Sequence, residues 1–273
     1  MNAPSDAPVV WVNGAFVATP ATAPVVAALD DGVLVGRGVF ETLSIRGPSE
    51  QEMKPFAFAR RRHMQRLQVS AGIVGVAVDI AHIERGIDAV LSRWGPRTGR
   101  LRVTVTAGGA AIVVASGVVP IDATATVVVA PWPRNERSPL AAAKTTACGD
   151  NVLAFEYAHD RGATEALFLN TRDEVCEGSR TNVFAVCDGL LVTPPLSAGC
   201  LAGVTRALVL EYGGAVEATL RLSQVMSASE AFLSSALRGA QPIAAIDGVA
   251  IGRGARPHTE RVARVLADLS ADA

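Results

Sequence analysis

The chain has 273 residues, of which 25 are Lys or Arg and 26 are Asp or Glu, so its formal net charge is −1. This balance argues against a nucleic-acid-binding protein, because neutralising phosphates requires a basic excess. We find no apolar run long enough to span a bilayer and no signal-peptide pattern, so we expect a cytoplasmic protein with no membrane partner. The length favours two domains.

The common metal ligands are few and widely spaced. Four cysteines occur without a CxxC pair, and four histidines occur without an HxxxH pair. These spacings match neither a zinc site nor a redox pair, so we expect no metal ion in this protein.

In the first half of the chain, alternating apolar residues predict strands, and apolar residues at helical spacing predict helices. A glycine-rich loop is expected at 30–38, with the sequence DDGVLVGRG. The expected strands are 9–14, 39–45, 101–107 and 126–130, and the expected helices are 60–73 and 82–94.

Residues 131–139, PWPRNERSP, contain three prolines and no apolar run, which is typical of a linker. Helices alternate irregularly with antiparallel hairpins on both sides of it, which indicates two α/β (α+β) domains, 1–130 and 140–273. After the linker we expect helices at 150–161 and 204–212, and strands at 165–170, 174–177, 182–186, 190–193, 231–234 and 243–246.

Lysine is rare in this chain, since only Lys54 and Lys144 occur among the 25 basic residues. Arginine cannot replace a catalytic primary amine, because guanidinium stays protonated and forms no imine. Lys144 follows the linker and is a candidate Schiff-base lysine, although a solvated surface lysine is the commoner interpretation of such a residue alone. Lys54 precedes a proline in a polar loop, which favours a surface role.

Several residues are candidates for binding a ring nitrogen or an anion. Glu177, at a strand end beside a glycine, can hold a protonated pyridine nitrogen. The backbone N–H groups of Val204 and Thr205, at the start of a helix, can bind a phosphate. Ser235 and Ala236, which follow a strand, form a second candidate for an anion. A turn or capping residue is the structural alternative in each case.

Two arginines are further candidates. Arg66, on a predicted helix, can reach a phosphate. Arg37, between two glycines, can bind a substrate carboxylate through two parallel hydrogen bonds. A solvent-facing helix residue and a flexible surface loop are the structural alternatives at these positions.

Together these segments resemble the class IV pyridoxal-phosphate enzymes of fold type IV, which include branched-chain aminotransferases, D-amino acid transaminases, (R)-selective amine transaminases and aminodeoxychorismate lyase. The motifs occur in family order over nearly the whole chain. They are WVNG at 11–14, GRGVFETL at 36–43, HMQRLQVSA at 63–71, LRVTVT at 101–106, KTTACGDNVLA at 144–154, GATEALFLN at 162–170, EGSRTNVF at 177–184, TPPL at 193–196, LAGVTR at 201–206 and PIAAIDG at 242–248.

The resemblance implies a pyridoxal 5'-phosphate (PLP) cofactor in a cleft between two α/β domains, with an amino donor and a 2-keto acid acceptor as substrates. It implies that Lys144 forms the Schiff base and transfers the proton, and that Glu177 pairs with the pyridinium nitrogen. It also implies a homodimer in which loops of the neighbouring chain complete each site. The resemblance also implies that Leu201 packs on the cofactor ring and that Phe40 and Glu41 line the substrate side. The residues implied to bind the phosphate are Arg66, Val204, Thr205, Ser235 and Ala236.

Three departures from the family pattern concern the substrate. Arg37 stands where the family often has aspartate. Ala-Gly-Gly at 107–109 replaces the Arg-x-His that holds the carboxylate in D-amino acid transaminases. The region of Cys148 and Gly149 replaces the tyrosine that follows the lysine in branched-chain aminotransferases. We hypothesise that Arg37 supplies the missing carboxylate contact.

The motif that begins at Lys144 looks closer to the D-amino acid transaminase and aminodeoxychorismate lyase branch. We therefore expect a D-amino-acid-transaminase-like enzyme that acts on D-amino acids and also on (R)-amines. Three alternatives stay open. They are an aminodeoxychorismate lyase releasing pyruvate and 4-aminobenzoate, a branched-chain L-amino acid aminotransferase, and a non-catalytic protein that binds a small ligand on the same fold.

Overall fold

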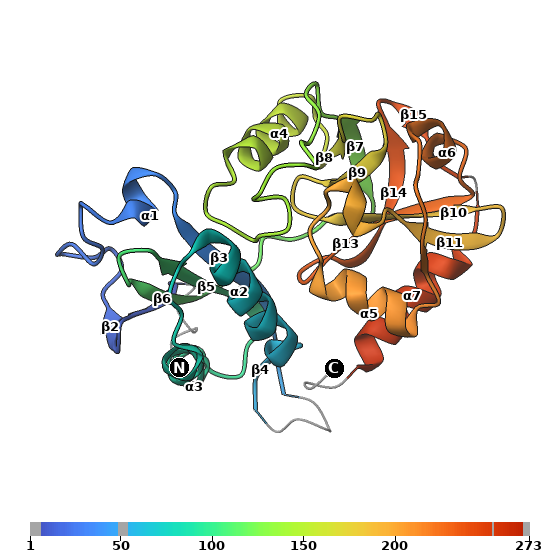
Figure 1. Cartoon of the computed structure of the whole chain (residues 1–273). Coiled ribbons are helices and arrows are strands. Elements are labelled where there is room, and N and C mark those ends of the chain that lie inside the picture. Colours follow the sequence, from blue (N-terminus) through green and yellow to red (C-terminus); the bar gives the residue numbers. More distant parts are fainter. Residues whose placement is uncertain (1–6, 49–53, 253, 270–273) are drawn as a thin grey trace. The chain divides into compact units, whose positions relative to one another are not determined.

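The structure, a computed structural model, describes residues 7–48, 54–252 and 254–269. The chain forms two compact units, coloured mainly blue to green and green to red in Figure 1. Unit 1 consists of the described residues up to Pro120 together with Ala143–Ala147. Unit 2 consists of Ile121–Ala142 and Cys148–Leu269.

The border between the units differs from the predicted one at two places. Strand β7 (Ala125–Val129), expected in the N-terminal domain, pairs with β8 (Glu165–Leu169) and β14 (Gly239–Ile246) and therefore belongs to unit 2. Lys144, expected in the C-terminal domain, lies in a short stretch that belongs to unit 1. Both differences arise from strand pairing between residues far apart in the chain, which local composition does not reveal.

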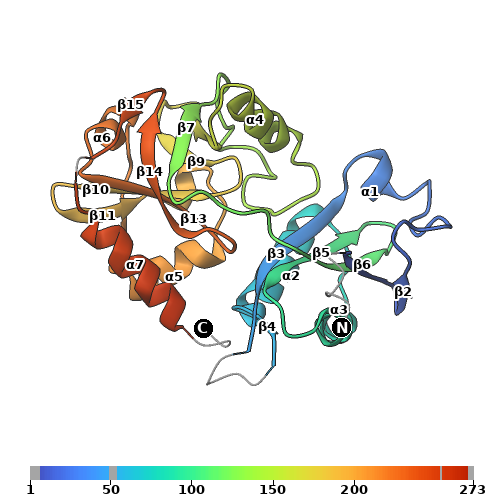
Figure 2. The ribbon, with the colours of Figure 1, turned by 180° about the vertical axis from the view of Figure 1, so that it is seen from behind.

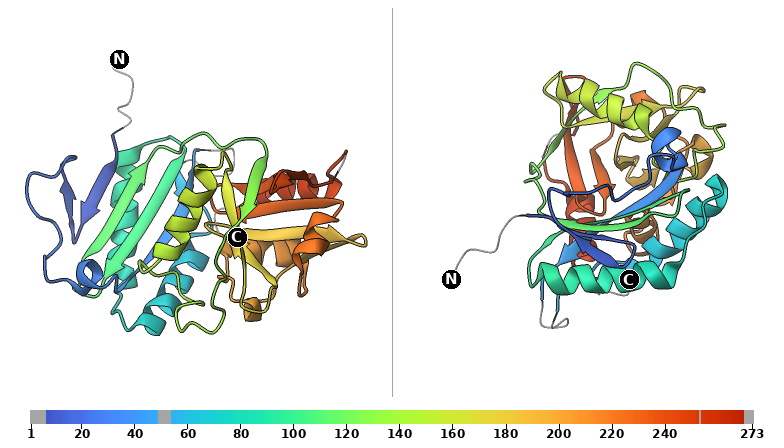
Figure 3. Two further views of the ribbon diagram at one scale, coloured as in Figure 1. Left: turned by 90° about the horizontal axis from the view of Figure 1, so that it is seen from above. Right: turned by 90° about the vertical axis from the view of Figure 1, so that its left-hand side faces the viewer.

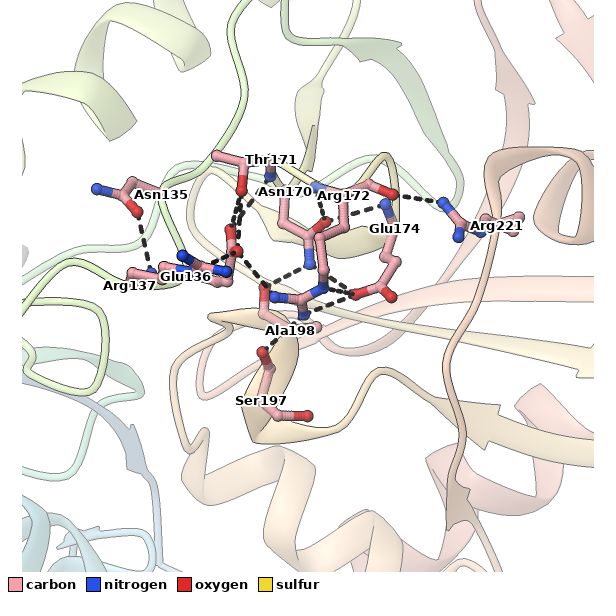
Figure 4. Close-up of polar contacts among 10 residues, drawn as sticks. All are labelled: Asn135, Glu136, Arg137, Asn170, Thr171, Arg172, Glu174, Ser197, Ala198 and Arg221. Atoms are coloured by element: carbon pink, nitrogen blue, oxygen red, sulfur yellow. Dashed lines mark hydrogen bonds and ion pairs between the residues drawn. The ribbon is translucent and has the colours of Figure 1, made fainter.

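The predicted linker is bound to unit 2 by its side chains, as Figure 4 shows. The Glu136 carboxylate accepts a hydrogen bond from the Thr171 hydroxyl at 2.8 Å and pairs with Arg172 Nη1 at 2.8 Å. Arg172 also pairs with Glu174 at 2.8 Å. Residues 131–139 are therefore part of unit 2 and do not form an independent connection between domains.

In the described residues, unit 1 contains a six-stranded antiparallel sheet with the order β2-β1-β6-β5-β3-β4. The predicted alternation over 101–107 is confirmed, because the apolar residues of β5 are buried and the polar residues between them are more exposed. The strands are β1 (Val9–Val12), β2 (Ala15–Val17), β3 (Gly38–Arg46), β4 (Phe56–Ala57), β5 (Gly99–Thr106) and β6 (Ala111–Ser116).

Two helices, α2 (Arg60–Val74) and α3 (Ile80–Trp94), cover one face of this sheet (Figure 3). Helix α3 begins after Asp79, whose side chain accepts the His82 N–H at 2.9 Å and so satisfies one unpaired donor of the first turn. The apolar faces of both helices and of the sheet form one core. A short helix, α1 (Asp31–Leu34), follows the capping residue Asp30.

Unit 2 is built on a larger mixed sheet, whose order within the described residues is β12-β11-β10-β13-β14-β7-β8-β9, with β15 beside β14. The pairs β14–β7, β7–β8 and β11–β12 are parallel, and the other pairs are antiparallel. The remaining strands are β9 (Val175–Gly178), β10 (Asn182–Cys187), β11 (Leu190–Thr193), β12 (Val216–Glu217), β13 (Glu230–Ser235) and β15 (Val249–Ala250).

Helices α5 (Val204–Tyr212) and α7 (Pro257–Asp268) pack side by side against β13 and β14 (Figure 2). Helix α4 (Gly149–His159) packs on β8, and α6 (Leu222–Met226) packs on β10. A 3₁₀ turn, Leu196–Ala198, precedes α5. These elements confirm the predicted α/β (α+β) class. Across the described ranges, every helix is too short or too polar to cross a membrane.

Candidate functional site

Lys144 lies beside β3 of unit 1, on a stretch of chain that is hydrogen-bonded to this strand. The Phe40 N–H donates to the Lys144 carbonyl at 3.0 Å, and the Thr146 N–H donates to the Gly38 carbonyl at 2.9 Å. The Lys144 N–H donates to the Ser70 hydroxyl of α2 at 3.0 Å. Because β3 and α2 both bind this backbone segment, the Cα of Lys144 has a fixed position from which its side chain extends.

The Phe40 ring contacts two cations. Lys144 Nζ lies 4.2 Å from the ring centroid, and the guanidinium carbon of Arg102 lies 3.9 Å from it. Phe40 and Arg102 lie on the face of the sheet opposite α2 and α3, because their chain neighbours Val39 and Val103 belong to the core under these helices. The sequence analysis did not single out Arg102. Arg102 lies on the polar side of the alternating LRVTVT segment, and this position could have indicated that it faces away from the core.

Glu41 points to the other face, toward α2, and is fully buried. Its Oε2 lies 2.7 Å from His63 Nδ1 and 2.6 Å from Arg66 Nη2, and its Oε1 accepts from Arg66 Nε at 2.8 Å. Burial by itself would raise the pKa of the Glu41 carboxyl, but Arg66 and His63 outweigh this effect and lower the pKa to about 2. Burial also lowers the pKa of His63, which favours a neutral ring that donates from Nδ1.

This geometry revises the substrate-side role expected for Glu41. Successive residues of a strand point to opposite faces, so Phe40 and Glu41 cannot both face the same ligand. Both carboxylate oxygens of Glu41 are bonded to α2. Glu41 therefore orients Arg66, the residue predicted to bind phosphate.

Arg37 binds to the end of α2. Its Nε donates to the Val74 carbonyl at 3.1 Å, its Nη2 donates to the Gly75 carbonyl at 2.9 Å, and its Nη1 lies 3.6 Å from Asp31. These contacts satisfy carbonyl groups left over at a helix C-terminus. The structure thus gives Arg37 a capping contact, and its predicted role toward a substrate carboxylate stays a prediction.

The turn at 107–109, where the Arg-x-His pattern is absent, is fixed by Asp30. Asp30 Oδ1 accepts the Gly108 N–H at 2.8 Å, and Oδ2 accepts the Thr106 hydroxyl at 2.5 Å. A Cβ at Gly108 would lie only 2.4 Å from Asp30 Cγ. The close approach of Asp30 to the backbone therefore leaves no room for a side chain at position 108, the middle position of the Arg-x-His pattern.

In unit 2, Glu177 lies at the end of β9 and is 5% exposed. Its Oε2 accepts the Leu201 N–H at 2.8 Å, and its Oε1 lies 3.3 Å from Arg134 Nη2. Arg134 is held in turn by Asn151, whose Oδ1 accepts from Arg134 Nη1 at 2.8 Å. The predicted ring contact Leu201 and the predicted ring-nitrogen partner Glu177 are thus joined directly.

The N-terminus of α5 carries the next predicted contacts, Val204 and Thr205. Its N-cap residue is Gly203, and no side chain caps the first turn. A Cβ at position 203 would lie 2.0 Å from Asn182 Oδ1, so a larger residue would require the Asn182 side chain or the loop to shift. The Asn182 Nδ2 donates to the Leu201 carbonyl at 3.0 Å, which fixes the loop before the helix. An uncapped helix N-terminus with glycine at its cap suits a phosphate group.

Ser235 is the last residue of β13 and Ala236 follows it, next to the same end of the sheet. Strands β10 and β13 are paired with Asn182 opposite Ser234, which brings the two loops to one edge of unit 2. The Ser235 hydroxyl accepts the Arg238 N–H at 3.2 Å. Unit 2 therefore groups Glu177, Leu201 and the two predicted phosphate loops, and unit 1 groups Lys144, Phe40, Glu41 and Arg66.

These two groups fit PLP in the chemistry of their donor sets. Unit 1 offers a primary amine and a guanidinium held by a buried carboxylate. Unit 2 offers a nearly buried carboxylate, suited to a protonated ring nitrogen, and main-chain N–H groups without a side-chain cap, suited to a phosphate. Each unit, taken by itself, thus contains residues of the types that this cofactor requires.

Comparison with known proteins gives a consistent result. The family model described as Amino-transferase class IV matches residues 38–246. The branched-chain-amino-acid aminotransferase of Salmonella typhimurium is 25% identical over 93% of this chain and 90% of its own length. The enzyme of the same name from Pseudomonas aeruginosa is 37% identical, but the match spans only 44% of this chain and 41% of that enzyme.

Solved structures show the same fold. A branched-chain aminotransferase of Thermoproteus uzoniensis with norvaline is 28% identical, with a TM-score of 0.82 over 97% of this chain and 96% of that chain. A PLP-bound hypothetical aminotransferase of Mycobacterium tuberculosis has a TM-score of 0.83 at 24% identity, over 96% of this chain and 98% of that chain. The D-amino acid branch expected from the sequence has no support among these relatives.

Proposed function

Because this chain belongs to the class IV aminotransferases, which are PLP-dependent enzymes, we propose that it transfers amino groups between branched-chain L-amino acids and 2-keto acids. The observation that carries the substrate assignment is the match to branched-chain aminotransferases over 93% of the chain. The absence of the Arg-x-His of the D-amino acid branch also supports it, since Ala-Gly-Gly stands at 107–109.

The proposed chemistry uses one group that moves a proton and several that bind. When bound, PLP supplies an electron sink for the charge left on the substrate Cα after its proton is removed. We assign to Lys144 Nζ the bond to the cofactor aldehyde and the transfer of this proton. The adjacent Phe40 ring, 4.2 Å from Nζ, restricts where the amine can lie.

The binding groups act through fixed charges and dipoles. The Glu177 carboxylate accepts a hydrogen bond from the protonated ring nitrogen. The Leu201 N–H donates to this carboxylate and holds it in one orientation. Arg66 offers guanidinium N–H donors to the phosphate, and Glu41 orients the guanidinium through two hydrogen bonds. The N–H groups of Val204 and Thr205 add the partial positive charge of a helix N-terminus.

On the substrate side we retain Phe40 and Arg37 and add Arg102. The Phe40 ring offers an apolar surface beside the reacting amine, which suits an aliphatic side chain. Arg102 brings a guanidinium to the same ring, on the same face of the sheet. A cation beside the reacting amine is suited to a substrate carboxylate.

We also propose that the active form is a homodimer. Four apolar residues of unit 1 between 29 and 35 are strongly exposed, and such a concentration within one short segment is unusual for a monomeric protein. They are Leu29, Val33, Leu34 and Val35, with relative exposures of 85%, 60%, 57% and 68% for the whole residue. Light scattering of the holoenzyme should give twice the mass of one chain, and a monomer at all concentrations would contradict this assembly.

Donor profiling tests the proposed function. The purified holoenzyme would be given L-leucine, L-valine, D-alanine, D-glutamate and (R)-phenylethylamine with 2-oxoglutarate or pyruvate as acceptor. We expect the highest kcat/KM with the branched L-amino acids. A preference for the D-amino acids would instead support the D-amino acid transaminase. Pyruvate release from aminodeoxychorismate without an acceptor would identify the lyase.

A further inference from the structure

Glu165 is a buried acidic residue with no part in the chemistry proposed above. It is the first residue of β8 in unit 2, and none of its surface is exposed. Burial raises the pKa of its carboxyl, and the nearby Arg238 guanidinium and Ser179 hydroxyl act in the opposite direction. Burying a carboxylate is costly unless hydrogen bonds and a counter-charge replace water, so its contacts indicate why the residue is present.

The carboxylate of Glu165 contacts the turn that follows Glu177. Oε1 accepts the Ser179 N–H at 3.1 Å and also the Ser179 hydroxyl in a short hydrogen bond. Oε2 lies 3.4 Å from the Thr181 hydroxyl. The turn is tight, because a Cβ at Gly178 would lie 2.1 Å from Thr181 Oγ1. Glu165 therefore holds the turn that begins directly after Glu177.

Glu165 also pairs, through Oε2, with Arg238 in the turn that carries Ser235. Arg238 Nη2 lies 3.3 Å from Glu165 Oε2, and Arg238 Nη1 donates to Gln241 Oε1 at 2.7 Å. The backbone N–H of Arg238 donates to the Ser235 hydroxyl at 3.2 Å. Arg238 is thus held at both its guanidinium and its main chain, and Glu165 is its acidic partner in this network.

We propose that Glu165 is a positioning residue that holds the Glu177 turn and the Ser235–Arg238 turn in a fixed relation, so that unit 2 binds the cofactor ring and phosphate together. The proposal rests on the proposed function, since that function assigns Glu177 and Ser235 to PLP. The argument from contacts uses residues of unit 2 alone.

A carboxylate is required at this position because donors surround both oxygens. In Glu165→Gln, an amide of the same shape replaces it. If the amide NH₂ faces Ser179, it meets the Ser179 N–H, and if it faces Arg238, it meets a guanidinium. The first orientation leaves the Ser179 N–H without its acceptor, and the second leaves Arg238 Nη2 with the Thr164 carbonyl alone, so each disturbs one of the two turns.

The test compares Glu165→Gln with Glu174→Gln, a matched control in the same unit. Glu174 also pairs with an arginine, at 2.8 Å, but in the network of Figure 4, which does not include the two turns. For each variant, the apoenzyme is titrated with PLP by fluorescence to give Kd. The melting temperature and the pH at which the visible absorption of the holoenzyme changes are also measured.

We expect Glu165→Gln to raise the Kd for PLP about tenfold or more, as outer-shell partners do in metal sites, and to move the pH of the absorption change. Glu174→Gln should lower the melting temperature while its Kd stays within about twofold of the wild type. A Kd for Glu165→Gln within that same range, or an equal loss in both variants, would overturn the proposal.

Two additions keep the result interpretable. Ser179→Ala removes a single hydroxyl from the network and serves if Glu165→Gln does not fold. We expect it to raise the Kd about threefold or more, and an unchanged Kd would overturn the proposal. Borohydride treatment of the wild-type holoenzyme checks the proposed function separately. A label on Lys144 beside a normal Kd for Glu165→Gln contradicts only the role of Glu165, whereas a missing label contradicts the proposed function.

Discussion

The residues around Lys144 in unit 1 and those around Glu177 in unit 2 are held by different interactions. In unit 1, the ion pair between Glu41 and Arg66 joins a strand to a helix through side chains. In unit 2, the main-chain N–H of Leu201 and the Arg134 guanidinium hold Glu177, and α5 begins after Gly203 with no side-chain cap. Changes of charge should therefore have a large effect at the Glu41–Arg66 pair of unit 1, and changes of backbone shape at the start of α5 in unit 2.

The largest expected effect is on the reacting amine of unit 1. Lys144→Ala should lower kcat for transamination by about 10⁴-fold or more, because the group that transfers the proton is lost. Lys54→Ala is the matched control, since it removes the other lysine of the chain, and it should leave kcat unchanged. Stopped assays of keto acid formation measure both. Comparable activity of the two variants would exclude the assigned role.

The second effect concerns the charge balance of unit 1. Replacing the buried carboxylate in Glu41→Gln should destabilise the protein by about 3 kcal/mol, because Arg66 loses its partner. The folded-state pKa of about 2 lies below the ordinary value of 4.5, so the stabilisation is complete above pH 4.5 and is lost as the pH falls toward 2. Urea unfolding at several pH values measures it.

The exposed pair of Asp88 and Arg60 provides the control for this prediction. Asp88 is 67% exposed on its side chain, so Asp88→Asn should change the stability by less than about 1 kcal/mol. If Glu41→Gln lowered the free energy of unfolding no more than Asp88→Asn does, the buried ion pair would not contribute substantially to the stability of unit 1.

The third effect tests the backbone of unit 2. Gly203→Ala places a Cβ 2.0 Å from Asn182 Oδ1, so either the loop before α5 shifts or Asn182 moves and loses its hydrogen bond to the Leu201 carbonyl. We expect the Kd for PLP to rise about thirtyfold, equivalent to about 2 kcal/mol, with a smaller change in melting temperature. Gly149→Ala, where no atom lies within 4 Å of the added Cβ, is the control. Equal PLP binding by both variants would show that α5 does not hold the phosphate.

The smallest effect is expected for Arg37. Arg37→Ala should raise KM for amino acid donors about tenfold and leave KM for (R)-phenylethylamine, if this amine is accepted, nearly unchanged, because only the amino acids carry a carboxylate. The capping contacts with Val74 and Gly75 offer another explanation of any effect. An equal loss with both kinds of donor would favour the capping role over the substrate contact.

The sequence predicted those parts of the structure that depend on local patterns. The helix predicted at 204–212 is observed as α5 with the same bounds, and that at 60–73 is α2 within one residue. The helix α7 and the strand β6 were not predicted. Strand β6 reads AIVVAS, where a continuous apolar run hides the alternation that marks a strand.

The features that the sequence did not predict depend on contacts between distant residues. Lys144 joins unit 1 through hydrogen bonds with β3, more than a hundred residues earlier in the chain. The same long-range pairing moves β7 into unit 2. Glu41 was placed on the substrate side by its motif, but strand alternation turns it toward α2. Motifs thus identified candidate residues, whereas the directions of their side chains required the fold.

The most direct test of the central assignment is to locate the lysine that bonds the cofactor. The holoenzyme is reduced with borohydride, digested, and its peptides are analysed by mass spectrometry. We predict a phosphopyridoxyl group on the peptide that contains Lys144 and an unmodified peptide for Lys54. A label on Lys54, or reduced protein that carries no label although PLP is bound, would contradict the account.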